Sequence, residues 1–185
     1  MSALPHIEPA DATGEAAALL TQLQNSIGAI PNMAKAMANS PALLKGWMEL
    51  SGALEHGVLP AAVRERLALA TAEYNGCEYC LSAHTFLAKN VAKLDGEEIE
   101  RARHAKSADP HAAALLALSD AIARGRGTVE EAAIKTARAA GITDAEIAEV
   151  IGNLALNTLT NYFNIAAGTD NEYPLVTPHS PTAAS

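Results

Sequence analysis

The sequence predicts an all-α protein. Aromatic residues make up only 4% of the 185 positions, and alanine and leucine dominate the rest. No stretch of useful length alternates apolar and polar residues with the valine, isoleucine and threonine content of a strand. We therefore expect helices at about residues 11–26, 41–56, 60–75, 77–92, 95–105, 109–125, 128–140 and 143–167.

Several of these helices have chemical signals at their ends. Pro60 stands where the first turn of a helix tolerates proline. Gly76 and Gly141 are typical of helix ends, since glycine readily adopts the left-handed conformation that stops a helix. Thr143 and Glu146 have the spacing of a capping box ahead of the last apolar run.

Length and composition indicate one domain over residues 1–185. With 49% hydrophobic residues the chain can bury a sizeable core, which we expect at about residues 28–170. The segment 173–185 contains three prolines and no helical periodicity. We expect it to be an extended tail.

The charge balance excludes several classes of partner. A formal net charge of -8 repels nucleic acids and anionic membrane surfaces. No apolar run approaches the length of about 20 residues that spans a bilayer, and the N-terminus lacks the basic start of a secretion signal. The sequence therefore predicts a soluble, cytoplasmic protein that binds neither nucleic acid nor membrane.

Both cysteines lie in one short stretch, "EYNGCEYCLSAH", at residues 73–84. In a reducing compartment a close pair is more often redox-active or metal-binding than structural. A closed zinc site needs four ligands, and the sequence has no second Cys-x-x-Cys and no His-x-x-x-His. Redox chemistry without a metal or organic cofactor is the favoured interpretation, and two buried small residues without chemistry are the alternative.

Helical geometry places the two thiols and an imidazole on one face. Counting 100° per residue, Cys77, Cys80 and His84 share the apolar stripe of the helix predicted at 77–92. The opposite, polar side carries Glu78, Ser82, Thr85 and Lys89. The reactive groups are thus expected to face the core.

Two cues compete for the attacking sulfur. Cys77 opens the helix, where free N–H groups and the helix dipole favour a thiolate. His84 follows Cys80 by four residues and can accept its proton across one turn. We predict that Cys80 attacks and that Cys77 is the resolving thiol.

The preceding helix offers a carboxylate for a proton relay. Glu65 shares a stripe with small apolar residues and is our candidate. Glu73, one turn before Cys77, is the rival. A surface ion pair of Glu65 with Arg64, with Arg66 or with a neighbouring helix is the alternative without a catalytic role.

Two further sets of polar residues are noted. The last helix carries asparagines at spacings of 4, 4 and 3, which we interpret as a solvated face or as interhelical hydrogen bonds, with a pocket lining less favoured: Asn153, Asn157, Asn161 and Asn164. The histidines outside the cysteine helix stand singly and are expected to be surface or capping residues: His6, His56, His104, His111 and His179.

The stretches "RERLALATAEYNGCEYCLSAHT" and "ALNTLTNYFNIAAGTDNEYP" resemble the carboxymuconolactone decarboxylase superfamily and, within it, the alkylhydroperoxidase AhpD-like, peroxidase-related branch. The resemblance covers roughly residues 28–174. It implies an AhpD-like helical bundle that assembles as a trimer or hexamer. The AhpD enzyme has a second histidine directly before its second cysteine, where this chain has Tyr79.

The same resemblance implies a thiol-dependent hydroperoxide reductase. Cys80 would attack the peroxide, Cys77 would resolve the sulfenic acid, and His84 with Glu65 would relay the proton. A dithiol protein, lipoyl-bearing or thioredoxin-like, would regenerate the thiols.

Two other functions stay open. One is the decarboxylase of aromatic catabolism that names the superfamily, which the Cys-x-x-Cys pair disfavours because true decarboxylases do not depend on it. The other is a non-catalytic, redox-sensing helical oligomer.

Overall fold

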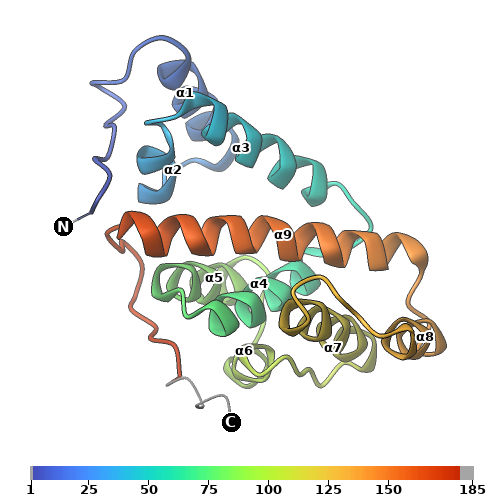
Figure 1. The fold of residues 1–185 in the computed structure, drawn as a ribbon. Coiled ribbons are helices and arrows are strands. Elements are labelled where there is room, and N and C mark those ends of the chain that lie inside the picture. The colour runs from blue at the N-terminus through green and yellow to red at the C-terminus, as the bar shows by residue number, and fades with distance from the viewer. Residues whose placement is uncertain (1, 180–185) are drawn as a thin grey trace.

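The computed structural model describes residues 2–179, and this part of the chain forms nine helices without a strand (Figure 1). The all-α prediction is confirmed. The helices are α1 Gly14–Ile27, α2 Asn32–Met37, α3 Pro41–Glu55, α4 Ala61–Asn75, α5 Glu78–Asn90, α6 Gly96–Arg103, α7 Pro110–Arg124, α8 Glu131–Ala139 and α9 Asp144–Ala167.

The predicted helices agree with the observed ones to within three residues at each end. The exception is α2, a helix of six residues that was not predicted. It lies between Pro31 and the N-cap Ser40 of α3, a stretch too short to show a helical period. Its buried Met33 and Met37 nevertheless belong to the core.

The long helix α9 separates two groups of helices. In Figure 1 it crosses the middle of the molecule, with α1, α2 and α3 on one side and α4 to α8 on the other. The buried helix α4 packs against α5, α6, α7 and α9. The helices α5 and α7 contact both α4 and α9, so α4 and α9 together form the centre of the bundle.

The apolar core consists of two clusters that meet at α4. One contains α1, α2 and the first turns of α5, including Leu20, Met37 and Leu81. The other contains α7 and the start of α9, including Leu116 and Val150. The cysteines belong to the first cluster.

The junction between α4 and α5 positions the cysteines. Gly76 ends α4 in the left-handed conformation, with φ of 69°, which costs glycine little. The chain then reverses so that Cys77 becomes the N-cap of α5. Because α5 contacts both α4 and α9, the first turn of α5 lies between these two buried helices.

The C-terminal segment from Thr169 to His179 is non-helical, as predicted, but it is packed against the bundle. The Asn171 amide and the Val176 backbone N–H both donate to Ser82 Oγ, at 2.9 and 3.0 Å. Ser82, on the polar side of the predicted helix, is therefore buried beneath this segment. Residues 180–185 of the predicted tail lie outside the described part.

No helix of residues 2–179 combines the length and the apolar character that crossing a membrane requires.

Candidate functional site

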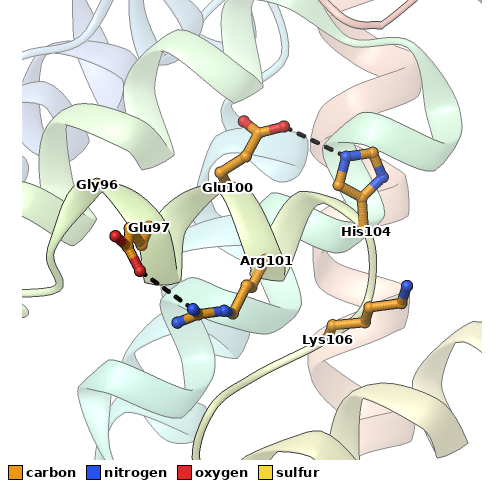
Figure 2. Close-up of a pocket in the computed structure, with 6 residues that line it drawn as sticks. All are labelled: Gly96, Glu97, Glu100, Arg101, His104 and Lys106. Atoms are coloured by element: carbon orange, nitrogen blue, oxygen red, sulfur yellow. Dashed lines mark hydrogen bonds and ion pairs between the residues drawn. The ribbon is translucent and has the colours of Figure 1, made fainter.

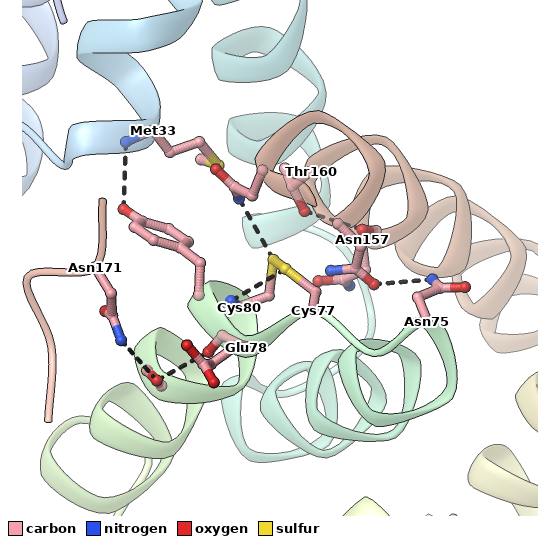
Figure 3. The surroundings of a disulfide bond; sticks show 12 residues. Met33, Asn75, Cys77, Glu78, Cys80, Asn157, Thr160 and Asn171 are labelled. Atoms are coloured by element: carbon pink, nitrogen blue, oxygen red, sulfur yellow. Dashed lines mark hydrogen bonds between the residues drawn. A yellow bond between two sulfur atoms is a disulfide. The ribbon is translucent and has the colours of Figure 1, made fainter. Parts of the chain in front are cut away.

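The two cysteines form a disulfide at the N-terminus of α5 (Figure 3). Their exposed fractions are only 1% for Cys77 and 3% for Cys80. The Cys80 backbone N–H donates to Cys77 Sγ at 3.2 Å, so Cys77 caps the helix through its sulfur. The predicted position of Cys77 at a helix start is confirmed, and N–H groups at this end favour negative charge on that sulfur.

His84 lies one turn after Cys80 on α5 and pairs with Glu65 on α4. His84 Nδ1 is 2.9 Å from Glu65 Oε2, and both side chains are about one-fifth exposed. A carboxylate at Nδ1 holds the proton on that nitrogen, which leaves Nε2 as the basic nitrogen of the ring. Among residues 2–179 no hydrogen bond joins His84 to either sulfur, both of which are already bonded in the disulfide.

Of the alternatives for Glu65, an ion pair with Arg64 or Arg66 is wrong, whereas a pair with a neighbouring helix is present, because His84 lies on α5. Arg66 Nε donates to Glu98 on α6 at 2.8 Å. Arg64 Nη1 donates to the carbonyl of Leu59 at 2.6 Å. Glu65 is thus available to the histidine, as the sequence predicts.

The rival carboxylate, Glu73, is directed elsewhere. Arg103 Nε on α6 donates to Glu73 Oε2 at 2.8 Å, and the His179 backbone N–H donates to Oε1 at 2.6 Å. Glu73 therefore joins α4 to α6 and to the C-terminal segment. Its carboxylate has no hydrogen bond to the cysteine pair among the described residues.

The asparagine stripe of α9 reaches the disulfide. All four members are buried, so the solvated-face interpretation is wrong: Asn153, Asn157, Asn161 and Asn164. The interhelical interpretation holds for Asn161 and Asn164, whereas Asn153 and Asn157 donate to carbonyls of α9 itself. Asn161 Oδ1 accepts from Asn75 Nδ2 at 2.9 Å, and Asn164 Nδ2 donates to Cys80 Sγ at 3.4 Å. Asn161 and Asn164 do not belong to the predicted catalytic set, although their spacing on a long helix is a signal that could have found them.

Two amide atoms beside the disulfide have no partner. Asn161 Nδ2 and Asn164 Oδ1 are buried and make no hydrogen bond within the described part of the chain. Leaving a buried polar atom unpaired costs about 1–3 kcal/mol. The unpaired acceptor of Asn164, whose amide also contacts Cys80, and the unpaired donor of Asn161, one turn earlier on α9, can therefore gain by binding a polar group of a substrate.

The Tyr79 side chain links α5 to α2 and to the C-terminal segment. Its hydroxyl donates to Glu172 Oε1 at 2.9 Å and accepts from the Met33 backbone N–H at 3.3 Å. Burial raises the pKa of Tyr79 well above its ordinary value, and the nearby Glu172 carboxylate adds to this. Tyr79 thus stays protonated at neutral pH, and it holds the C-terminal segment against α5 instead of acting as a base.

Fold and site define an all-α protein with a buried Cys-x-x-Cys disulfide at a helix N-terminus, flanked by a histidine–glutamate pair. Residues 41–119 match the model of the carboxymuconolactone decarboxylase family, and this stretch carries all four predicted site residues. Comparison with the curated proteins finds no match.

Solved structures show the same fold. The alkylhydroperoxidase AhpD core of an uncharacterized peroxidase-related protein from Ralstonia eutropha JMP134 has a TM-score of 0.81 at 23% identity, over 92% of each chain. An uncharacterized peroxidase-related protein from Silicibacter sp. TM1040 has a TM-score of 0.79 at 23% identity, over 93% of each chain. The predicted AhpD-like fold is confirmed.

A third similar structure is a cysteine-to-alanine variant of the debrominase Bmp8 in complex with 2,3,4-tribromopyrrole. Its TM-score is 0.77 at 16% identity, over 93% of this chain and 92% of that one. At this identity the likeness concerns the fold.

Proposed function

We propose that the protein is a thiol-dependent hydroperoxide reductase. The observation that carries the proposal is the Cys77–Cys80 disulfide, placed one helical turn before the His84–Glu65 pair. A dithiol that closes within one turn, next to a histidine oriented by a carboxylate, has the parts of an activated nucleophile with a resolving partner. The family and the AhpD-like fold support this assignment.

In the proposed cycle the reduced Cys80 first loses its proton to His84. The Cys80 thiolate attacks the terminal oxygen of the hydroperoxide, an S–O bond forms, and the O–O bond breaks. The alkoxide that leaves takes the proton from His84 and departs as an alcohol, while Cys80 becomes a sulfenic acid. Cys77 then attacks the Cys80 sulfur, the S–O bond breaks, water leaves, and the disulfide closes.

The choice of Cys80 as nucleophile rests on its neighbours. His84 lies one turn away on the same helix, and the Asn164 amide donates to the Cys80 sulfur. A donor to sulfur stabilises the thiolate and the charge that develops on oxidation. The Cys80 N–H donates in turn to Cys77, which favours a thiolate at Cys77 when this sulfur resolves the sulfenic acid.

The unpaired amide atoms of Asn161 and Asn164 bind the peroxide group in this proposal. A hydroperoxide offers one O–H donor and two acceptor oxygens, which complements one free Nδ2 and one free Oδ1. Because Asn164 contacts the Cys80 sulfur and Asn161 lies one turn before it on α9, the two amides would hold the O–O bond near the attacking atom.

Regeneration needs an external dithiol that is itself oxidised to a disulfide. Both sulfurs of the chain are almost fully covered, so a slender dithiol reaches them more easily than a protein surface does. This favours a lipoyl-bearing protein over a thioredoxin-like one. The reducing conditions that such a cycle needs agree with a cytoplasmic location.

A homo-oligomer, trimeric or hexameric, is part of the proposal. The outer face of α9 carries an exposed apolar stripe: Ile151, Leu159, Tyr162 and Ile165. A second copy of the chain that covers this stripe would remove it from water. Static light scattering gives several chains per particle if this is correct, and a monomer of 19.2 kDa contradicts it.

The test mixes the reduced protein with one equivalent of cumene hydroperoxide and counts free thiols against time, followed by turnover with dihydrolipoamide. We expect rapid loss of both thiols in the wild type and none of this loss in Cys80→Ser. Thiols that persist for hours contradict the proposal and direct attention to lactone decarboxylation. Oxidation that stops after one round despite the reductant indicates a redox sensor.

A second oxidant belongs in the same assay. The debrominase with 2,3,4-tribromopyrrole shares this fold, and a Cys-x-x-Cys dithiol can supply two electrons to other oxidants than peroxide. Bromide release from this compound, together with inertness toward hydroperoxides, would assign the dithiol to dehalogenation.

A further inference from the structure

A second cluster of reactive side chains lies away from the disulfide, between α6 and the C-terminal segment. Glu100 is on α6, His104 is the C-cap residue of that helix, and His179 belongs to the C-terminal segment. Figure 2 shows Glu100 and His104 side by side at a surface pocket on α6. His104 and His179 are surface residues, as expected, and the fold stacks their rings at 4.9 Å with an interplanar angle of 6°.

The three side chains converge on one point. The Nε2 atoms of His104 and His179 lie 3.2 and 3.1 Å from the same oxygen, Glu100 Oε1. The ligand atoms of all three lie within 4.8 Å of one another. Ligands at about 2.1 Å from a tetrahedral zinc ion are about 3.4 Å apart, so small side-chain movements would admit the ion.

Neighbouring groups orient the three residues. Arg103 Nη1 donates to Glu100 Oε2 at 3.1 Å, which leaves Oε1 directed at the imidazoles. Glu73 Oε1 lies 3.4 Å from His179 Nδ1 and also accepts the His179 backbone N–H. Histidines that bind metals usually present their other ring nitrogen to a carboxylate in this way. Glu73 is thus placed to support His179 as a ligand.

We propose that Glu100, His104 and His179 form a site for Zn²⁺ or a similar divalent transition-metal ion, with water completing the coordination. Two imidazoles and one carboxylate are suitable zinc ligands. The adjacent Arg103 lowers the negative charge of the site, so binding is weaker than in a closed structural site. This site is independent of the thiol reaction and departs from the sequence-based expectation of no metal.

Metal binding at this site fixes the C-terminal segment to α6. The same segment covers Ser82 through Asn171 and holds Tyr79 through Glu172. A bound ion therefore stabilises the cover over α5 without touching the cysteines. Protection of backbone amides in residues 171–179 against hydrogen exchange should increase when Zn²⁺ is added.

The test is isothermal titration of the full chain with Zn²⁺ in its disulfide form, in which the cysteine thiolates cannot compete. We expect about one equivalent per chain in the wild type. His104→Ala and His179→Ala should each lose this binding. Glu73→Gln should weaken it about tenfold or more.

The matched control is His111→Ala, because His111 forms a single exposed pair with Glu146 at 2.7 Å without a second histidine. This variant should bind zinc like the wild type. Equal affinity of all variants, or no binding to the wild type, overturns the proposal. Binding of zinc to the reduced form alone would place the ion on the thiols and would also overturn the proposal. An NMR spectrum in which the signals of His104 and His179 do not shift on addition of zinc would overturn it as well.

Discussion

Glu65 and Glu73 lie on the same helix, α4, yet their carboxylates pair with side chains of different elements. Their side chains are similarly buried, with exposed fractions of 19% and 12%. Glu65 pairs with a histidine, which exchanges protons near neutral pH. Glu73 pairs with Arg103 at 2.8 Å, and the guanidinium does not lose its proton in proteins. The other oxygen of Glu73 lies 3.4 Å from His179 Nδ1, in the C-terminal segment and not on the cysteine helix. The partner therefore decides whether a buried carboxylate can serve a proton relay or only joins two helices.

Removing the Cys80 sulfur, whose proton the Glu65–His84 relay would accept, should reduce the rate of peroxide reduction most. Cys80→Ser should reduce peroxide consumption to the uncatalysed level, because a serine hydroxyl is not ionised at neutral pH. Cys77→Ser should keep the first step and leave a sulfenic acid at Cys80, detectable with dimedone by mass spectrometry. The reverse pattern would assign the attack to Cys77 and would separate Glu65 from the chemistry.

A matched pair of variants, one at Glu65 and one at Glu73, tests whether the two carboxylates have different roles. Glu65→Gln should slow peroxide reduction by about 10²- to 10⁴-fold, the usual contribution of a proton-transfer group, with a small change in stability. Glu73→Gln should keep the rate near that of the wild type and lower the free energy of unfolding by about 1–3 kcal/mol, because Arg103 loses a charged partner. Stopped-flow kinetics measures the rate and urea unfolding measures the stability. A slow Glu73→Gln variant beside a Glu65→Gln variant with the wild-type rate would assign the proton relay to Glu73.

A third buried carboxylate, Glu98, has a structural role like that of Glu73. Glu98 is buried on α6; burial raises its pKa, but hydrogen bonds from Ser107, Ala108 and Arg66 outweigh this and hold the pKa at about 2. Because the folded pKa lies below the ordinary value of 4.5, the stabilisation is complete above about pH 4.5 and is lost as the pH falls toward 2.

Glu98→Gln should therefore lower the free energy of unfolding by about 3 kcal/mol at pH 7, since each pKa unit corresponds to about 1.4 kcal/mol. The difference from the wild type should shrink as the pH falls below about 4.5. Urea unfolding at several pH values measures it. A difference that does not change with pH would show that packing, not charge, holds α4 to α6 here.

His84→Ala removes the partner that distinguishes Glu65. We expect Cys80 in the reduced protein to react with iodoacetamide about tenfold more slowly at neutral pH, because less thiolate forms without a proton acceptor. The profile of alkylation rate against pH should move to higher pH, whereas Glu73→Gln should leave it in place. Identical profiles for wild type and His84→Ala would remove His84 as the base.

The sequence predicted much of this fold because its signals are local. Gly76 and the Thr143–Glu146 capping box mark helix ends by backbone geometry that neighbouring residues determine. The helix α2 has too few residues for a period to show. The burial of Ser82 depends on a segment about ninety residues later in the chain, and local patterns carry no information about such packing.

The candidate site was predictable to the same extent. Helical spacing placed Cys77, Cys80 and His84 on one face, but two carboxylates on α4 had comparable claims. Only the packing of α5 and α6 against α4 shows that Glu65 meets His84 and that Glu73 meets Arg103. The rotation of one helix against another is a tertiary property that the sequence pattern does not specify.

The smallest expected effect concerns the amide that contacts the attacking sulfur. Asn164→Ala removes the donor to Cys80 Sγ and should slow peroxide reduction by about three- to tenfold, the value of one ordinary hydrogen bond. Asn153→Ala is the control from the same buried stripe, because its amide donates to the Glu149 carbonyl and not to a sulfur. If both variants slow the reaction equally, the effect comes from the packing of α9. If Asn164→Ala alone does so at unchanged stability, the catalytic set extends beyond Glu65 and His84 to α9.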